Sequence, residues 1–549
     1  MTRQSTGGQG VSHCLRFRKR PLAACLAATM AMTLAGPALA NGNADKLREA
    51  NHRWLLLSGQ NSGNTHLPTL SGRQADMAEA AMQRLLGTQA PSVVTGVTIP
   101  VSNCNNTGSG SLRAAVGLAA SGDTIDMSGL SCTVNLSSSI VTSADDLTIQ
   151  GNPNHKYPYI SGQNTVTPLV HGGTGTLTLS GVTVENGKFS STSTTRSPGG
   201  CVFSAGNVVL SDSTRIKYCT TQNTASGKAE GGGIYSAGYT SVLSGSVVTG
   251  GHAIASSGSA LGGGIYAKGG VNIKYGSVVG SSASTASGTI VRGGGIYSGQ
   301  GLDTKYANIG NNKVSGGSVG LNVGGGAWIT GDTTMFNSTV YGNQADAAAA
   351  MLLGRSAGTT GIYESTIANN KSLASSSKYG GGLYLGNSST INNCTITGNT
   401  EKNAGDDKYG AGILIKSGTA VSMSSTIVSG NFLIHSTSGN LNSDIRGNST
   451  TPATITGDHN LIGLTKYTTT PGDTISDGDP KLGPLQDNGG FTLTTAVLPS
   501  SAAIDAGTAN SNTVDQRGSG FTRTIGAAPD IGAFERGADI IFANGFESP

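Results

Sequence analysis

The chain has 549 residues, of which 85 are Gly and only 12% are charged. Helix formers are scarce while Ser, Thr, Asn, Val and Ile abound, which favours short strands joined by turns and excludes the charge-rich composition of a disordered chain. The formal net charge of +4 falls to about −1 without residues 1–40, which hold five bases and no acid. A nearly neutral body lacks the basic face that nucleic-acid binding requires, so no nucleic-acid partner is expected.

The first 40 residues have the order of an export signal. Arg16–Arg20 is positively charged, Leu22–Leu34 is a short apolar run, and Ala38–Ala40 matches a small-residue cleavage site. The apolar run is too short to span a bilayer. We predict a signal peptide over residues 1–40, export to the extracellular space or the outer cell surface, and no transmembrane span after cleavage.

Residues 41–92 carry no repeat and are interpreted as a linker or pro-region. Within them, Gln74–Leu86 places apolar residues at helical spacing, which predicts a short helix. Residues 93–165 have the pattern of a cap and first coils. Strands are expected at Val93–Val101, Asp123–Met127, Thr133–Leu136 and Asp146–Gly151, and a short helix is expected at Ser111–Ala120.

A motif of three glycines followed by Ile-Tyr organises residues 166–435. It stands at Gly231–Tyr235, and neighbouring copies are 30 to 32 residues apart. The other copies are Gly262–Tyr266, Gly293–Tyr297, Gly324–Trp328 and Gly380–Tyr384, with weaker ones at Gly200–Phe203, Met351–Leu352 and Ile413–Leu414. Such a period marks a repeat architecture. One unit suits one turn of a right-handed parallel β-helix, so we predict an all-β solenoid with a short helical N-terminal cap and a small C-terminal domain.

Stacked turns would align equivalent residues in columns, because side chains alternate faces along a strand. One interior column is expected from Ile234, Ile265, Ile296, Ala327, Leu383 and Ile413, and a second from Val340, Ile367, Ile396 and Ile427. Near the turns, side-chain amides are expected to hydrogen-bond from coil to coil at Asn343, Asn370, Asn399 and Asn431.

Five cysteines remain after the predicted cleavage. In an oxidising compartment, Cys104 with Cys132 and Cys201 with Cys219 are the expected local disulfides. No Cys/His spacing typical of zinc occurs. Cys394 takes the place of Ser338, Ser365 and Ser425 in neighbouring repeats, so we interpret it as a small interior residue and not as a nucleophile.

The C-terminal part lacks the glycine motif. Residues 436–478 are expected to hold the last coils and a connector, residues 479–535 a small domain, and residues 536–549 a tail. Four motifs follow in order within the small domain, at Asp487–Gly490, Ala502–Gly507, Asp515–Gly518 and Asp530–Glu535. The groups Asp515/Arg517 and Asp530/Glu535 are predicted to make internal salt bridges there.

These motifs resemble families of bacterial secreted proteins. Cys104 with Gly110–Ala115 and Gly122–Ile125 resembles the opening Cys-Ser-Leu-Arg-Glu-Ala block of secreted β-helix proteins, although here Cys104 stands apart from Ser111 and Ala replaces Glu. The glycine repeats are similar to those of polymorphic outer membrane proteins, and residues 479–535 resemble a choice-of-anchor domain, type Q-like. The resemblance implies surface association or export sorting in a Gram-negative bacterium, without implying catalysis.

A β-helix also suggests an alternative function, a pectate-lyase-like polysaccharide lyase or hydrolase. Such enzymes need clustered carboxylates for acid–base chemistry or for calcium. Acidic residues are sparse in the repeats of residues 166–435 and do not recur at one equivalent position of the repeat. Asp406 and Asp407 are the candidate catalytic pair, and Asp473, Asp477 and Asp479 are candidate Ca²⁺ ligands. We favour solvated loop charges for both sets and expect no other cofactor.

The ring of each glycine motif supplies the candidate ligand-binding site. If the preceding Ile points inward, the rings point outward along one face, at Tyr235, Tyr266, Tyr297, Trp328 and Tyr384. Such a stripe could stack on sugars of a polysaccharide or pack against a cell-surface protein. The alternative is that the rings stack on one another and stabilise the sheet. We predict a non-catalytic, adhesin-like or structural module that binds glycan or protein through this aromatic face and its loops.

Overall fold

The structure is a computed structural model that describes residues 96–537, apart from residues 153–157, 289, 318–321, 355–357, 374–379, 404–409, 436–438, 448–450, 477 and 510. The predicted signal peptide, the predicted linker with its helix at Gln74–Leu86, and residues 538–549 of the tail lie outside the described residues. All of the described residues belong to the compact unit that begins at Thr95.

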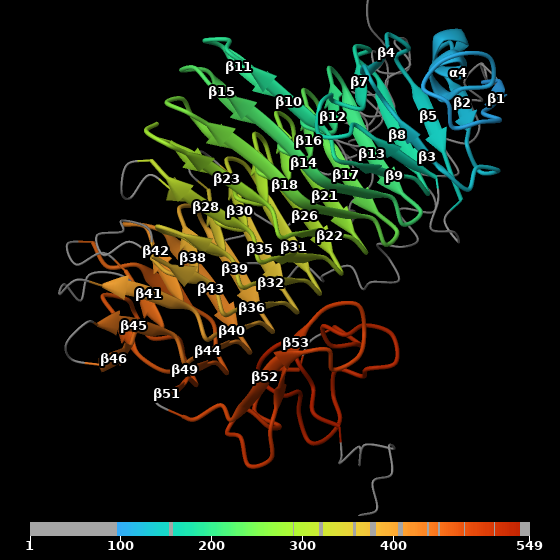
Figure 1. The fold of residues 1–549 in the computed structure, drawn as a ribbon. Helices are drawn as coiled ribbons and strands as arrows, with labels where there is room; N and C mark the ends of the chain where they lie inside the picture. Colours follow the sequence, from blue (N-terminus) through green and yellow to red (C-terminus); the bar gives the residue numbers. More distant parts are fainter. Residues whose placement is uncertain are drawn as a thin grey trace, which may run out of the picture. The chain divides into compact units, whose positions relative to one another are not determined.

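Most described strands stack in parallel, turn upon turn, into three sheets named A, B and C that enclose an apolar interior (Figure 1). Sheet A contains β1 (Thr98–Pro100), β2 (Asp123–Asp126), β5 (Leu147–Gln150), β8 (Thr176–Ser180), β13 (Asn207–Ser211), β17 (Thr240–Leu243), β21 (Val271–Lys274), β26 (Leu302–Lys305), β31 (Thr333–Phe336), β35 (Thr360–Tyr363), β39 (Ser389–Asn392), β43 (Ala420–Ser424) and β48 (Thr454–Thr456). Sheet C contains β4 (Ile140–Thr142), β7 (Leu169–His171), β12 (Val202–Ser204), β16 (Ile234–Ser236), β20 (Ile265–Ala267), β25 (Ile296–Ser298), β30 (Ala327–Ile329), β34 (Met351–Leu353), β38 (Leu383–Leu385), β42 (Ile413–Ile415), β47 (Ile445–Arg446) and β50 (Thr465–Lys466).

Sheet B forms the remaining side and is parallel except for β46, which runs antiparallel to β45. It contains β3 (Thr133–Asn135), β6 (Tyr159–Ser161), β9 (Thr183–Glu185), β10 (Lys188–Ser191), β14 (Arg215–Asn223), β18 (Val247–Ala255), β22 (Ser277–Val279), β23 (Ser282–Thr285), β27 (Asn308–Gly310), β28 (Lys313–Gly316), β32 (Thr339–Tyr341), β33 (Gln344–Ala345), β36 (Thr366–Ala368), β37 (Lys371–Ser372), β40 (Thr395–Thr397), β41 (Thr400–Asn403), β44 (Ile427–Val428), β45 (Phe432–His435), β46 (Gly439–Asn442), β49 (Leu461–Ile462) and β51 (Ile475–Ser476). The predicted parallel β-helix is therefore confirmed.

A short side sheet and a hairpin complete the described fold. Sheet D contains β11 (Arg196–Pro198), β15 (Lys228–Glu230), β19 (Ala260–Leu261), β24 (Val291–Arg292) and β29 (Asn322–Val323), each directly before a glycine motif. The antiparallel hairpin of β52 (Leu482–Gln486) and β53 (Thr494–Val497) belongs to the C-terminal segment 479–537, drawn in red in Figure 1.

The glycine motifs mark the place where the chain turns into sheet C. A Cβ atom on Gly232 would lie 2.2 Å from the backbone nitrogen of His252 and 2.3 Å from the carbonyl oxygen of Gly263. Both contacts are with backbone and cannot be relieved by a side-chain movement, so only glycine fits. The repeat seen in the sequence is thus a packing requirement of this corner.

The predicted interior columns are confirmed except at one residue. Ile234, Ile265 and Ile296 pair in register and are fully buried. In the second column, however, Ile396 pairs with Val428, and Ile427 pairs with Thr395. The prediction for Ile427 is wrong because the stretch from Ser425 to Asn431 contains one residue more than its neighbours, and a one-residue slip reverses the face of a strand side chain.

The predicted asparagine contacts form a buried ladder between turns. Asn343 donates from Nδ2 to Oδ1 of Asn370 at 2.9 Å, and Asn370 donates to Oδ1 of Asn399 at 2.9 Å. Asn431 ends the row by donating to Oδ1 of Asp444 at 2.8 Å. Coil-to-coil amide bonding is therefore confirmed.

The N-terminal cap is helix α4 (Leu112–Leu118). Its first turn is capped by Ser111, whose hydroxyl accepts a hydrogen bond from the backbone nitrogen of Ala114. The helix buries Leu112, Ala115 and Val116 in the interior of the solenoid. No helix among the described residues is long and apolar enough to cross a membrane.

Both predicted disulfides are present, Cys104–Cys132 and Cys201–Cys219. Cys394 is free and buried, as predicted for an interior residue. Its equivalent in the following turn is Thr426, whose hydroxyl accepts from the backbone nitrogen of Cys394, and not Ser425 as the sequence suggested. The same extra residue that displaced Ile427 explains this difference.

Candidate functional site

The rings that follow the glycine motifs form a continuous stack on the outer side of sheet C, which we call the aromatic ladder. Its members are Phe203, Tyr235, Tyr266, Tyr297 and Trp328. Successive ring centroids are 5.3, 5.1, 4.8 and 4.6 Å apart, and the interplanar angles are at most 15°. The rings point away from the interior column, as the sequence predicted, and stack on one another.

The ladder leaves little ring surface to solvent. Tyr235 and Trp328 are each 3% exposed and Tyr266 is 8% exposed, while Tyr297 is half-buried. Tyr384 occupies the same column further along, beyond the fully buried Leu352. Because neighbouring rings occupy each other's faces, a ligand would meet ring edges and hydroxyl groups here.

Sheet D lies beside the ladder and covers one side of it. Leu261 packs with Tyr235 and Tyr266 in one apolar cluster. Further along, the guanidinium carbon of Arg292 lies 4.8 Å from the ring centroid of Trp328, within cation–π range. Leu261 and Arg292, each directly before a glycine motif, therefore face the rings.

An arginine, a carboxylate and a phenol meet at the start of this side sheet. Nη1 of Arg196 donates to the hydroxyl oxygen of Tyr235 at 2.5 Å, and Nε of Arg196 lies 3.3 Å from Oε2 of Glu230. Glu230 is 1% exposed, whereas the side chain of Arg196 is 48% exposed. The buried carboxylate holds a guanidinium group that still reaches solvent.

Burial shifts the protonation of these groups. It raises the pKa of Glu230, and the nearby Arg196 and Lys228 oppose this change. Burial likewise raises the pKa of Tyr235 and of Tyr266, so both phenols keep their protons at neutral pH. Protonated hydroxyl groups beside a half-exposed guanidinium suit hydrogen bonding to polar or anionic groups of a ligand, while proton abstraction by the phenols is disfavoured.

The predicted acidic candidates are only partly described. Asp406, Asp407 and Asp477 lie outside the described residues. Asp473 and Asp479 are exposed, and Oδ1 of Asp479 accepts from the backbone nitrogen of Lys481 at 2.8 Å. Among the described residues, no three His, Cys, Asp or Glu side chains gather in a way that could hold a metal ion. The catalytic pair and the calcium site stay predictions.

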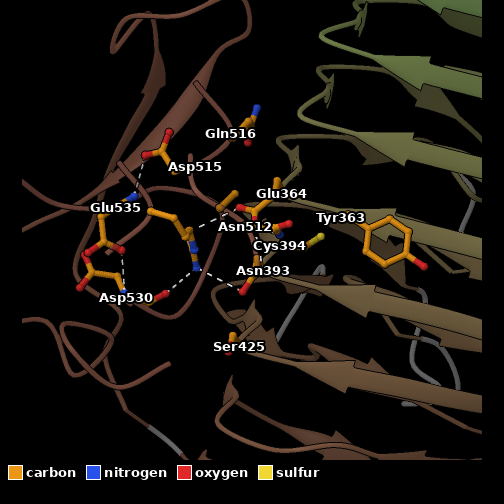
Figure 2. Close-up of polar contacts among 12 residues, drawn as sticks. Tyr363, Glu364, Asn393, Cys394, Ser425, Asn512, Asp515, Gln516, Asp530 and Glu535 are labelled. Carbon is orange, nitrogen blue, oxygen red and sulfur yellow. Dashed lines mark hydrogen bonds and ion pairs between the residues drawn. The ribbon is translucent and has the colours of Figure 1, made fainter. Parts of the chain in front are cut away.

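A second polar cluster is buried where segment 479–537 meets the solenoid (Figure 2). Nη1 of Arg523 lies 3.6 Å from Oε2 of Glu364, while its Nη2 donates to Oδ1 of Asn393 at 3.2 Å and to the carbonyl of Asp530 at 2.7 Å. Oε1 of Glu364 also accepts from Nδ2 of Asn512 at 2.7 Å. Glu364 and Asn393 belong to the solenoid, so this cluster joins two distant parts of the chain.

The carboxylates of this cluster are held in a desolvated setting. Burial raises the pKa of Glu364 to about 7, against the opposing effect of Arg523. Burial also raises the pKa of Glu535 to about 7, and its two oxygens accept from the backbone nitrogens of Ile525 and Asp530. The contacts of Arg523 and Asn512 with Glu364 join the segment to the solenoid, so the cluster serves the docking of the segment.

The predicted pairs within the segment are confirmed in part. Nη2 of Arg517 lies 2.6 Å from Oδ2 of Asp515, as predicted. Asp530 and Glu535 instead accept backbone hydrogen bonds, because Arg523, their basic neighbour, turns toward Glu364 on the solenoid. The sequence offers no local signal for that partnership.

Arg196, Glu230 and Arg292 belong to the aromatic face, although the sequence pattern did not predict them there. Their signal was readable, because Glu230 and Arg292 each occupy the position directly before a glycine motif. Apolar and charged residues alternate at that position from one turn to the next. The sequence therefore does not show that their side chains share one orientation. Arg196 becomes relevant only through its contact with Tyr235 in the following turn.

Known proteins offer little similarity to this chain. No protein-family model matches it, and no curated protein is significantly similar to it. Among solved structures, an alginate lyase, AlyF-OU02 in complex with G6, is similar at 12% identity with a TM-score of 0.31. The match covers 75% of this chain and 93% of the lyase.

Proposed function

We propose that this protein is an exported, non-catalytic β-helix module of the extracellular space or outer surface of a Gram-negative bacterium, which binds glycan or protein in an adhesin-like or structural role. The observation that supports it best is the aromatic ladder, flanked on its sheet D side by Arg196 and Arg292. Residues 1–40 act as the signal peptide and residues 479–535 as the anchor-like segment in this proposal.

The geometry of the ladder suits an extended ligand. Adjacent strands of a sheet are ~4.8 Å apart, so a solenoid repeats the same chemical group at a short interval along its axis. Repeat proteins use such elongated surfaces for binding. The half-exposed Arg196 at one end adds a charged anchor, and two disulfides agree with an oxidising compartment outside the cytoplasm.

Binding of the mature protein to glycan arrays and to intact cells tests the proposal. Because the rings pack on one another, the test variant removes polar groups and keeps the stack: Arg196→Ala combined with Tyr235→Phe. We expect affinity to fall about tenfold or more, the loss of roughly one or two charge-assisted hydrogen bonds. The matched control is Arg215→Ala with Tyr218→Phe, which alters an exposed pair on sheet B.

Two outcomes would overturn the proposal. Equal binding by the test variant and the control would show that the aromatic ladder is not the binding face. Release of unsaturated or reducing-end products from a polysaccharide by the mature protein would show a catalytic function and restore the lyase or hydrolase alternative.

A further inference from the structure

A separate group of aromatic side chains lies where segment 479–537 meets the corner between sheets A and B. We call Tyr275, Tyr306 and Phe491 the seam cluster. The rings of Tyr275 and Tyr306 stack with centroids 4.9 Å apart, and Phe491 meets Tyr275 edge-on at 4.8 Å and 76°. The backbone carbonyl of Phe491 is fixed by a hydrogen bond of 3.2 Å from Nδ2 of Asn308. Two distant segments of the chain thus build one cluster.

The seam cluster exposes ring faces, unlike the aromatic ladder. Tyr306 is 8% exposed, but Tyr275 is 41% and Phe491 is 58% exposed. In the preceding turn the same corner is formed by Ser244, whose side chain is small, and Gly245, which has none, so neither covers the ring of Tyr275. Exposed apolar surface in such a corner is typical of a contact site. One face of Tyr275 stays open, with Phe491 standing beside it as a wall.

Two lysines lie on the strands next to the seam cluster. Lys274 and Lys305 pair in register on neighbouring strands and are both exposed. Nζ of Lys305 lies 5.8 Å from the ring centroid of Tyr306. Neither ammonium group forms an ion pair with another of the residues that the structure describes. Asp303 lies two residues before Lys305 on the same strand, so strands β21 and β26 together carry one acid and two bases.

We propose that the seam cluster is a binding site for a uronic acid residue of an acidic polysaccharide. The apolar C–H face of a pyranose ring would lie on the open face of Tyr275, against the edge of Phe491, since aromatic rings offer a flat apolar surface. The sugar carboxylate would pair with the ammonium groups of Lys274 and Lys305, because opposite charges across an interface steer and orient a ligand. This site is distinct from the aromatic ladder and does not depend on it.

Affinity electrophoresis of the full mature chain through gels with polygalacturonate or hyaluronate tests this site. The variants are Tyr275→Asn with Phe491→Ser, and Lys274→Gln with Lys305→Gln. Asn suits position 275, because Asn337 and Asn393 hold the equivalent corner at positive φ, 47° and 53°, next to the 54° of Tyr275. We expect each double variant to lower affinity about tenfold or more, and added salt to weaken binding by the wild type through charge screening.

Control variants at other exposed positions and a control ligand without carboxylates test the specificity of this site. Tyr218→Asn and Lys416→Gln remove an exposed ring, also at positive φ, and an exposed ammonium elsewhere, and should leave retardation unchanged. Carboxyl-reduced polygalacturonate should not retard the wild type. Wild type that passes both acidic gels unretarded, or variants retarded as strongly as wild type, would overturn the proposal. So would a loss of self-association in Tyr275→Asn, which would mark the patch as a contact between copies. Tyr275→Asn with Phe491→Ser should keep the glycan or cell binding that depends on Arg196 and Tyr235, which separates this site from the proposed function.

Discussion

A carboxylic acid with almost no exposure to water must either find a partner or give up its charge. Glu364 has partners for both carboxylate oxygens, because Arg523 lies near one oxygen while Asn512 and Asn393 donate to the other. Burial nevertheless outweighs the guanidinium and raises the pKa of Glu364 to about 7. The residue therefore takes up a proton in the folded protein at a pH at which an exposed glutamate would be ionised.

The substitution Glu364→Gln tests this balance through the pH dependence of stability. The folded pKa lies above the ordinary value of 4.5, so the folded state holds a proton that the unfolded state has lost. Stability from this group is full below the ordinary pKa and is lost as pH rises to about 7. Relative to wild type, Glu364→Gln should therefore gain on the order of 2–3 kcal/mol in free energy of unfolding between pH 4 and pH 8.

Urea denaturation of both proteins across that pH range measures the difference. The neighbouring Glu535, whose pKa burial also raises to about 7, is present in both proteins and cancels in the comparison. A relative loss of stability by Glu364→Gln as pH rises would show that the contact with Arg523 dominates burial, contrary to our argument.

At the scale of the element, the asparagine ladder shows how strand stacking is secured at a turn. Asn370 is fully buried, and its Nδ2 donates to the carbonyl of Val340 at 3.0 Å and to Oδ1 of Asn399 at 2.9 Å. Its own Oδ1 accepts from the backbone nitrogen and from Nδ2 of Asn343. Each asparagine satisfies groups of both neighbouring turns, so its loss leaves buried donors and acceptors on either side.

Asn370→Ala should therefore destabilise the protein strongly. We expect a loss of about 3 kcal/mol or more in free energy of unfolding, because several buried polar groups lose their partners at once. Asn369→Gly is the matched control. Asn369 is adjacent and exposed, and its φ of 59° is one that glycine adopts without strain. Urea titrations should separate the two variants clearly, and an equal effect of both would contradict a structural role for the ladder.

The elements also show what a sequence can and cannot reveal. The glycine motif predicts sheet C, with its Ile side chains pointing inward and its rings pointing outward. This prediction is possible because the motif repeats at a regular spacing, so each position has the same surroundings in every turn. The predicted register of Ile427 is wrong, since one added residue before it reverses its face, and the seven-residue span from Ser425 to Asn431 marks the insertion. The same slip hides a contact, because Ile427 packs outside the solenoid against Ile531 and Phe534 of segment 479–537.

At the scale of the molecule, segment 479–537 docks on the solenoid through hydrogen bonds and forms one structural unit with it. The sequence motifs at 479–535 suggest an anchor-like domain, but its docking partners include strands that precede it by more than a hundred residues. Nδ2 of Asn337 donates to the carbonyl of Asp515 at 3.0 Å, and the backbone nitrogen of Gly532 donates to the carbonyl of Ser425 at 2.8 Å. Neither contact has a sequence signature, because each is accepted by a backbone carbonyl, a group that every residue carries. Tertiary placement of this kind is beyond a single sequence.

Gln516 provides the test of this continuity. Its side chain is fully buried between the segment and sheet B, where Oε1 accepts from Oγ1 of Thr366 at 2.6 Å and Nε2 donates to Oγ1 of Thr339 at 2.9 Å. Gln516→Ala removes both bonds, so the free energy of unfolding should fall by about 2–3 kcal/mol. Gln486→Ala, at an exposed position of β52 in the same segment, is the control and should leave stability unchanged.

Hydrogen exchange then decides whether the segment and the solenoid open together. In wild type, amides of the segment and those of β32 and β36 should exchange with similar protection, because the docked surfaces share buried polar groups. In Gln516→Ala, protection should fall in the segment and in these two strands alike. Faster exchange confined to residues 479–537, with β32 and β36 unchanged, would show instead an independent domain resting on the solenoid.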